Sequence, residues 1–337
     1  MWTGRKYEKY YRKKDYYKKA DMKKILMGHN FKREGFKSLE GKFEMIYPEN
    51  NYFTKEEVLE RITDVEVIIP NFSFQTNKEI MDAGKNLKLI ANFGVGYNNI
   101  DVDYAAQKGI TVTNTPNSVL EPTAELCFAL IIATARRIGF YNNRLHSNER
   151  IGWGLFDNLG LPVYGQTLGI YGMGRIGQAV ARRAVASGMK IIYCNRNRLD
   201  KSIEDKYDAK FVDFDTLLKE SDFISLNAPA TSETFHLMGE NEFKKMKKTA
   251  ILINAARGSL VDEQALIKAL EKEEIFAAGL DVFEHEPKIP EELKKFENVI
   301  LTPHAGTQTY AGRIEMEEEV SRNILNFFEG GKISKVN

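Results

Sequence analysis

The stretch Thr167-Leu-Gly-Ile-Tyr-Gly-Met-Gly-Arg-Ile-Gly177 decides the fold class of this 337-residue chain. Its first five residues have the apolar composition of a buried β-strand, and glycines at 172, 174 and 177 follow at the spacing Gly-x-Gly-x-x-Gly. The small and aliphatic side chains of residues 178–184 then favour a packed helix. A strand, a glycine turn and a helix in this order are typical of a doubly wound α/β sheet.

The glycine turn also predicts a ligand. Gly172 permits a tight turn, Gly174 lets the backbone approach a pyrophosphate, and Gly177 lets the helix pack on the strand. The pyrophosphate would lie at the positive end of the helix that begins with Arg175 and Ile176. A glycine triplet alone can be a structural turn, but the flanking strand and helix favour dinucleotide binding at these five residues.

The end of the next strand indicates which dinucleotide is bound. NAD-type sites usually have a carboxylate about 20 residues after the glycines, where it accepts the ribose 2′-hydroxyl. This chain has Tyr193-Cys-Asn-Arg-Asn-Arg198 there, with no acid before Asp200. The guanidinium groups of Arg196 and Arg198, beside the uncharged Asn195, suit a 2′-phosphate, so we favour NADP(H) over NAD(H). The alternative is that both arginines are solvated loop charges.

Strand-like and helix-like segments alternate on both sides of this turn. The length favours two domains of about 150 residues, and the alternation predicts parallel sheets. The last helix, at 310–328, lies beyond the second strand series and is expected to return to the first domain. We therefore predict two Rossmann-like doubly wound parallel-sheet α/β domains with a cleft between them. They are a substrate domain at 22–117 plus 308–337 and a dinucleotide-binding domain at 118–307.

One predicted helix is unusual because it is apolar on most faces. It covers residues 123–147, and such all-round apolarity indicates burial between domains or between subunits. Shorter helices are predicted at 54–62, 175–187, 214–220, 240–244 and 263–272.

Composition and charge exclude several classes of protein. Hydrophobic residues make up 43% and charged residues 28% of the chain, as in ordinary globular proteins. Two cysteines cannot form a disulfide framework or a four-thiolate metal site, so we expect a reducing cytoplasm and no metal. No apolar run approaches the roughly 20 residues of a membrane helix, and no signal-peptide core is evident.

The first 21 residues differ from the rest of the chain. Residues 1–21 carry a net charge of +5 and interleave five tyrosines with lysines, whereas the remainder has a net charge of −4. A basic tail can bind nucleic acid. A solvated extension is the simpler interpretation, and the negative remainder makes nucleic-acid binding unlikely.

Three polar residues follow three predicted strands of the second series. Arg257, Glu286 and His304 each come just beyond an apolar run, and such positions face the ligand crevice of a doubly wound sheet. Together they would supply a cation, a carboxylate and a proton donor. Loop charges are common, so the spacing alone leaves a solvated role open.

At this point the chain resembles a known family, the D-isomer-specific 2-hydroxyacid dehydrogenases, and most closely their glyoxylate and hydroxypyruvate reductase branch. The resemblance covers roughly residues 22–335. It rests on several motifs in order: Asn92-Phe-Gly-Val-Gly-Tyr-Asn-Asn-Ile-Asp101, the 168–177 stretch, Leu226-Asn-Ala-Pro229, Asn254-Ala-Ala-Arg-Gly258, Gly279-Leu-Asp-Val-Phe283 and Thr302-Pro-His304.

The resemblance implies reduction of a small 2-keto acid to the D-2-hydroxy acid. His304 would protonate the carbonyl oxygen, and Glu286 would pair with His304. Arg257 would bind the substrate carboxylate and polarise the keto group. The backbone N–H groups of Val95 and Gly96 would hold the second carboxylate oxygen.

The resemblance also implies cofactor contacts and a homodimer through residues 118–150. Asn195 and Arg196 would lie at the adenosine ribose, Ala255 beside the nicotinamide, and Asp281 at its carboxamide. The other expected cofactor residues are Ala228 and Pro229 on the adenine side, and Gly306 next to the proton donor.

Two departures from the family pattern leave the substrate open. Asn98 stands where many relatives have Asp, and Ala305 replaces a larger aliphatic residue, which could enlarge the pocket. The pocket walls would come from residues 72–74, Tyr97 and Trp153. The alternatives are an NADH-dependent dehydrogenase of the D-lactate or 3-phosphoglycerate type and a dinucleotide-sensing protein similar to the co-repressors of this fold.

Overall fold

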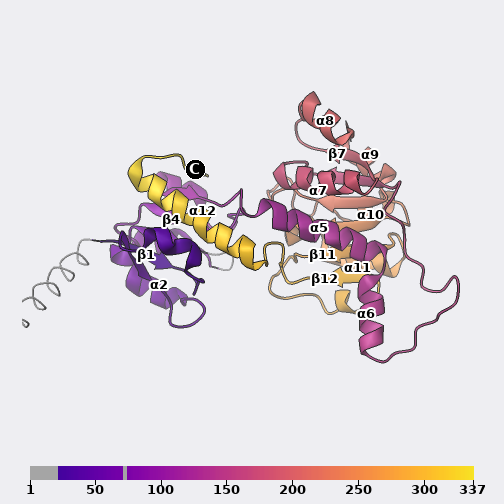
Figure 1. Cartoon of the computed structure of the whole chain (residues 1–337), viewed down its shortest axis with the longest axis horizontal. Coiled ribbons are helices and arrows are strands. Elements are labelled where there is room, and N and C mark those ends of the chain that lie inside the picture. Colours follow the sequence, from indigo (N-terminus) through magenta and orange to yellow (C-terminus); the bar gives the residue numbers. More distant parts are fainter. Residues whose placement is uncertain (1–21, 71–73) are drawn as a thin grey trace, which may run out of the picture. The chain divides into compact units, whose positions relative to one another are not determined.

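The computed structural model describes residues 22–70 and 74–337. They form two compact units, one running to Val119 and resuming over Thr309–Asn337, and one spanning Leu120–Gln308 (Figure 1). The first boundary lies two residues after the predicted one at 117, and the second lies one residue after the predicted one at 307. The extension at 1–21 and Phe72 lie outside the described residues. In the part of the chain that is described, no helix is long and apolar enough to span a membrane.

The first unit is built on a parallel sheet with the strand order β2-β1-β3-β4-β5. Its strands are β1 (Lys23–Met27), β2 (Phe43–Ile46), β3 (Val67–Ile69), β4 (Leu89–Ala91) and β5 (Thr111–Thr113). Its helices are the 3-10 turns η1 (Glu34–Leu39) and η2 (Ile62–Asp64), and α2 (Lys55–Arg61), α3 (Lys78–Ala83), α4 (Val102–Gln107) and α12 (Tyr310–Glu329). The predicted start of α2 is confirmed, because Thr54 and Glu57 form a capping box there.

Helix α12 completes the first unit from the far end of the chain, as expected. Its buried Glu319 accepts hydrogen bonds from the backbone N–H groups of Asn117 and Ser118, and from Ser118 Oγ at 2.7 Å. Its Glu317 accepts from the backbone N–H of Gly35 at 2.9 Å. These bonds join segments that are more than 200 residues apart in sequence.

The second unit is built on a parallel sheet with the strand order β12-β11-β10-β9-β6-β7-β8. Its strands are β6 (Thr167–Tyr171), β7 (Lys190–Cys194), β8 (Ala209–Phe211), β9 (Phe223–Leu226), β10 (Ile251–Asn254), β11 (Ala277–Leu280) and β12 (Val299–Leu301). Its helices are α5 (Leu120–Ala135), α6 (Ile138–His146), α7 (Arg175–Ala186), α8 (Lys201–Tyr207), α9 (Phe214–Glu220), α10 (Glu240–Lys245) and α11 (Glu263–Glu271), with the 3-10 turns η3 (Gly258–Leu260) and η4 (Leu293–Lys295).

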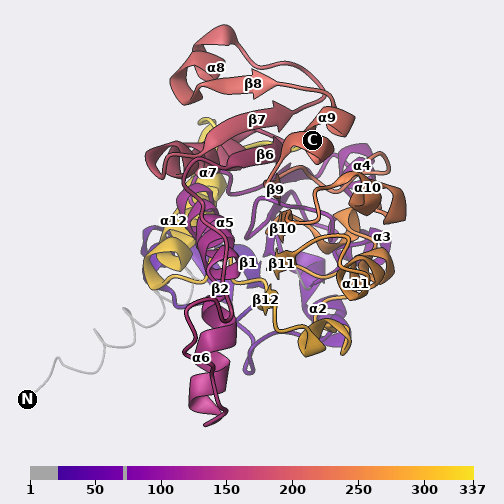
Figure 2. The same cartoon turned by 90° about the vertical axis from the view of Figure 1, so that its right-hand side faces the viewer.

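Helices cover both faces of this sheet, so the predicted doubly wound architecture is confirmed. Figure 2 shows α5 and α7 on one side of the strands and α9, α10 and α11 on the other. One buried apolar cluster joins the strands to α5 and α7, and another joins them to α9, α10 and α11. The strand order reverses where β6 lies between β9 and β7. Ligands of such sheets bind beyond the carboxyl ends of the strands at this reversal.

The prediction of one long helix at 123–147 is wrong. Arg137 adopts a left-handed conformation (φ 53°) that separates α5 from α6. Its guanidinium lies over the ring of Phe140 at 4.3 Å, a local contact that helical periodicity does not reveal. The sequence also did not predict β8, which has only three residues.

Candidate active site

The three glycines of the turn after β6 meet three different steric requirements. Gly172 has φ +91°, and a Cβ there would lie 2.7 Å from the Ala228 nitrogen. A Cβ at Gly177 would lie 2.6 Å from the carbonyl oxygen of Gly172. By contrast, a Cβ at Gly174, at the start of α7, would meet no described atom within 4 Å. The first and third glycines therefore allow close packing, whereas Gly174 leaves open space of the kind a pyrophosphate needs.

A pocket of about 410 Å³ opens beside this turn. Its floor includes Asn195, whose Oδ1 accepts a 2.6 Å hydrogen bond from the Met173 N–H and so fixes the glycine turn. The described residues that line it are Tyr171, Gly172, Gly174, Cys194, Asn195, Arg196, Asn197, Asn227, Ala228, Pro229, Thr231, Glu233 and Thr234. Seven of the predicted cofactor residues are outside that lining: Arg175, Ile176, Gly177, Arg198, Ala255, Asp281 and Gly306.

Arg198 has a different partner from the one we expected. Its Nε and Nη2 both donate to the carboxylate of Glu204 at 2.9 Å, and Tyr193 Oη donates to the same carboxylate at 2.8 Å. The hydrogen bonds from Arg198 and Tyr193 lower the pKa of Glu204 to about 2. Arg198 therefore braces the segment after β7, and Arg196 is the arginine that faces the pocket.

The expected proton donor and its carboxylate form a close pair. His304 Nδ1 lies 2.7 Å from Glu286 Oε2, while Glu286 Oε1 accepts from the Phe283 N–H at 3.0 Å. Burial favours a higher pKa for Glu286, but the hydrogen bond and charge of His304, with smaller contributions from Phe283 and Arg257, bring this pKa below its ordinary value. Glu286 is therefore an ionised partner for the imidazole.

Arg257 belongs to the same cluster of charges. Burial lowers the pKa of its guanidinium, and the nearby negative charge of Glu286 opposes that change. The next residue, Gly258, permits this arrangement because a Cβ there would lie 1.9 Å from the carbonyl carbon of Phe283. The loops that follow β10 and β11 are thus in backbone contact, and the structure brings Arg257, Glu286 and His304 together in one unit.

Asp281 holds the turn that contains His304. Its carboxylate accepts hydrogen bonds from Thr302 Oγ1 (2.6 Å) and from the N–H groups of Ala305 (2.7 Å) and Gly306 (2.9 Å). Burial raises the pKa of Asp281 despite these bonds. Asp281 and Gly306, both predicted to contact the cofactor, therefore have an observed role in supporting His304, which itself has φ +52°.

The Val95–Gly96 loop of the first unit has the form of an anion site. The Asn92 side-chain amide donates to the carbonyl oxygens of Gly94 (3.0 Å) and Gly96 (2.8 Å), and Asn114 Nδ2 donates to that of Val95 (2.9 Å). These bonds fix the loop carbonyls, while the N–H groups of Val95 and Gly96 bond to no described residue. Two unsatisfied N–H groups in a glycine turn suit a carboxylate oxygen. Sequence reasoning missed Asn92 and Asn114, although Asn92 begins the motif.

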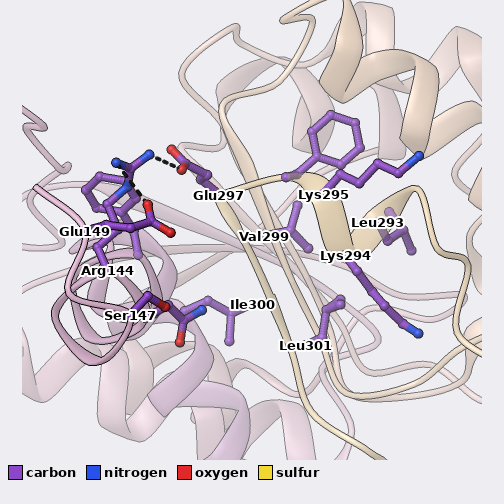
Figure 3. Close-up of a pocket in the computed structure, with 14 residues that line it drawn as sticks. Arg144, Ser147, Glu149, Leu293, Lys294, Lys295, Glu297, Val299, Ile300 and Leu301 are labelled. Atoms are coloured by element: carbon purple, nitrogen blue, oxygen red, sulfur yellow. Dashed lines mark hydrogen bonds and ion pairs between the residues drawn. The ribbon is translucent and has the colours of Figure 1, made fainter.

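A second pocket, of about 450 Å³, lies between α6 and the segment that leads into β12 (Figure 3). The Arg144 guanidinium points toward Glu149, at 3.3 Å, and toward Glu297, with which it also pairs. Arg144 thus connects α6 to the edge of the sheet.

Two residues that were expected to form walls of the substrate pocket lie at the surface. The exposed fraction is 43% for Tyr97 and 93% for Trp153.

Comparisons with known proteins agree with this geometry. The family model "D-isomer specific 2-hydroxyacid dehydrogenase, NAD binding domain" matches residues 128–306. A glyoxylate reductase of Thermococcus litoralis is 44% identical over 312 residues, which cover 91% of this chain and 94% of that protein. The chain belongs to the D-isomer specific 2-hydroxyacid dehydrogenase family. Members are NAD(P)-dependent oxidoreductases that act on CH–OH donors, and this enzyme interconverts a small 2-keto acid and its 2-hydroxy acid.

Solved structures support the same family. A glyoxylate reductase from Paecilomyes thermophila superposes with a TM-score of 0.85 at 36% identity, covering 94% of this chain and 98% of that one. An NADPH-dependent glyoxylate/hydroxypyruvate reductase from Sinorhizobium meliloti, in complex with NADP and malonate, has a TM-score of 0.82 at 32% identity, covering 94% and 97%. The similarity spans both units of this 2-hydroxyacid dehydrogenase.

Proposed function

We propose that this dehydrogenase reduces glyoxylate or hydroxypyruvate to the D-2-hydroxy acid, with NADPH preferred over NADH. The observation that carries the proposal is the cluster of Arg257, Glu286 and His304 in the unit that also holds the glycine turn. When bound, the reduced dinucleotide supplies the hydride.

The chain's own residues bind the substrate and supply the proton. In the second unit, Arg257 is the residue we assign to the substrate carboxylate. In the first unit, the N–H groups of Val95 and Gly96 are the donors we assign to a carboxylate oxygen. His304 donates a proton from Nε2 to the carbonyl oxygen, because Glu286 occupies Nδ1. The hydrogen bond to the ionised Glu286 fixes the orientation of the imidazole ring.

The substrate assignment is tested by measuring kcat/KM for NADPH and NADH with glyoxylate, hydroxypyruvate, pyruvate and phosphohydroxypyruvate. We expect the highest values with glyoxylate or hydroxypyruvate and NADPH. A clear preference for pyruvate or phosphohydroxypyruvate with NADH would support the D-lactate or 3-phosphoglycerate alternative. Dinucleotide binding without turnover on any 2-keto acid would support the sensing role.

The coenzyme preference rests on Arg196. It lines the pocket together with Asn195 and Asn197, and no carboxylate from the end of β7 is among the described lining residues. We expect Arg196→Asp to reduce kcat/KM for NADPH at least tenfold more than for NADH, since a phosphate–guanidinium pair is charge-assisted. Arg198→Asp is the matched control, because Arg198 bonds to Glu204 instead. Equal losses with both coenzymes in the Arg196 variant would refute the assignment.

We further propose a homodimer. The expected interface covered residues 118–150, and we place it on the last part of that range, which contains α6, and on the segment that follows. Six large apolar side chains in these segments are exposed, and exposed apolar surface of this kind is typical of an interface: Ile138, Leu145, Trp153, Leu155, Phe156 and Leu159. Sedimentation of the wild type should give a dimer, and Leu155→Ser with Phe156→Ser should give a monomer. A monomeric wild type would contradict the proposal.

The free thiols of Cys127 and Cys194 support a reducing, cytoplasmic setting.

A further inference from the structure

The turn that presents Glu286 is held at one residue by two separate side chains. The backbone N–H of Glu284 donates to Glu263 Oε1 at 2.8 Å. The side chain of Glu284 is bonded at its Oε1 to His236 Nε2, also at 2.8 Å. Glu284 lies two residues before Glu286, and its side chain is only 17% exposed. Neither His236 nor Glu263 was singled out by the sequence or needed for the proposed chemistry.

His236 also bonds to the loop that contains Arg257. Its backbone N–H donates to the Ser259 carbonyl oxygen at 2.8 Å, and Met238 continues the pairing with Leu260 at 2.9 Å. Through its backbone, His236 is therefore attached to the segment that follows Arg257. Through its ring, it is attached to the turn that precedes Glu286. One residue thus bridges the loops after β10 and β11.

Glu263 completes the bridge from the first turn of α11. It is buried, and burial raises its pKa, with the charges of Glu284 and Glu286 adding to that rise. Three carboxylates therefore lie near one another, at 263, 284 and 286. His236 is bonded to one of them and His304 to another. Without its imidazole partner, Glu284 would be expected to move away from the other carboxylates toward solvent, and the turn would move with it.

We propose that His236 and Glu284 are positioning residues for this reaction, holding the Glu286–His304 pair and the Arg257 loop in one geometry. The inference rests on the proposed roles of those three residues. Reactive groups must be placed within a fraction of an ångström, and a shift of about 1 Å can cost about 100-fold in rate. Loss of the link should therefore reduce turnover.

The test compares Glu284→Ala, Glu284→Gln, His236→Asn and the His236→Asn/Glu284→Ala double variant of the full chain. Asparagine at 236 tolerates the observed φ of +49° but is too short to reach Glu284. Glutamine at 284 keeps an oxygen that can accept the hydrogen bond. Glu292→Ala, at an exposed residue beyond this turn, is the control.

We expect Glu284→Ala and His236→Asn each to lower kcat about tenfold or more. The Kd for the dinucleotide should be unchanged in Glu284→Ala, because Glu284 is outside the lining of the dinucleotide pocket. Glu284→Gln should have a kcat close to that of the wild type. The double variant should have about the same kcat as the single variant with the lower kcat, because either substitution alone already breaks the same link. Additive losses, a Glu284→Gln variant as impaired as Glu284→Ala, or kcat within twofold of wild type would each overturn the proposal. The assay uses whichever 2-keto acid the wild type turns over best, so an incorrect substrate proposal appears first in the wild type.

Discussion

Gly258→Ala is the substitution whose effect on catalysis can be worked most directly from the structure. The added Cβ would lie 1.9 Å from the carbonyl carbon of Phe283, 2.0 Å from its oxygen and 2.4 Å from the Glu284 nitrogen. Real Cβ contacts essentially never fall below 3.0 Å, so the two backbones must separate by about 1 Å. Neither backbone is a flexible side chain that could rotate away. One backbone continues from Arg257, and the other leads to Glu286.

This separation should have a large kinetic effect and a moderate effect on stability. A displacement of about 1 Å between groups that act together costs about 100-fold in kcat, or about 2.7 kcal/mol of transition-state stabilisation. Overpacking of this kind costs about 1–3 kcal/mol of folding free energy. None of the three atoms nearest the added Cβ belongs to the glycine turn after β6, so the Kd for the dinucleotide should change less than kcat.

The assay follows nicotinamide absorbance during 2-keto acid reduction, with thermal unfolding and coenzyme titration on the same protein. Gly139→Ala is the control, because its Cβ would meet only ordinary contacts, the nearest at 3.4 Å from Ile300. A Gly258→Ala enzyme with kcat within threefold of wild type would show that the contact between the two loops does not set the catalytic geometry.

Four further outcomes are expected. Gly174→Ala, with no described atom near its Cβ, should leave Tm unchanged but weaken dinucleotide binding in a titration, and unchanged affinity would count against the pyrophosphate position. Glu319→Ala should lower the free energy of unfolding by about 3 kcal/mol in a urea titration, because it leaves the N–H groups of Asn117 and Ser118 without their acceptor. The Glu204 contribution to stability should be complete above pH 4.5 and be lost as the pH falls toward about 2, so acid titrations of wild type and Glu204→Gln should converge near pH 2. Asn254→Asp should lower kcat severalfold in steady-state kinetics, since only an amide can both donate to the Arg257 carbonyl (2.9 Å) and accept from the Ala256 N–H (3.1 Å).

Local patterns in the sequence were enough to predict most of the fold. The strand before the glycine turn, the helix after it and α9 all appear at the expected residues, because apolar periodicity and turn chemistry are local properties. Arg137 shows the limit of this reasoning. Its left-handed backbone interrupts a segment of helical composition, and nothing in the spacing of apolar residues distinguishes that break from a continuous helix.

The candidate site was predictable in its chemical groups and less so in their partners. Arg257, Glu286 and His304 follow strands, so their proximity could be inferred from the sheet alone. The pairing of Arg198 with Glu204 could not, because either guanidinium after β7 satisfies the same electrostatic pattern, and the choice depends on the placement of α8. The N–H groups of Val95 and Gly96 could likewise not be singled out from the sequence. They stand out as donors only because the structure shows that the carbonyl groups of the same loop are bonded to Asn92 and Asn114.

A shared device explains how short loops in both units keep a defined shape. Four strands are each ended or followed by Asn or Asp, whose side chain bonds to the backbone of a loop with a functional role: Asn92 after β4, Asn195 after β7, Asn254 in β10 and Asp281 after β11. Of the three amides, Asn92 and Asn254 each donate to a backbone carbonyl, which a carboxylate cannot do, whereas Asn195 accepts from a backbone N–H. The carboxylate stands at 281, where all three bonded groups are donors. At residues 92, 254 and 281 the choice between Asn and Asp therefore follows from which backbone groups the loop presents, whereas at residue 195 an acceptor of either kind would serve. At all four positions the side chain holds a loop in a defined shape, so that the groups that act on the substrate can lie on loops without losing their geometry.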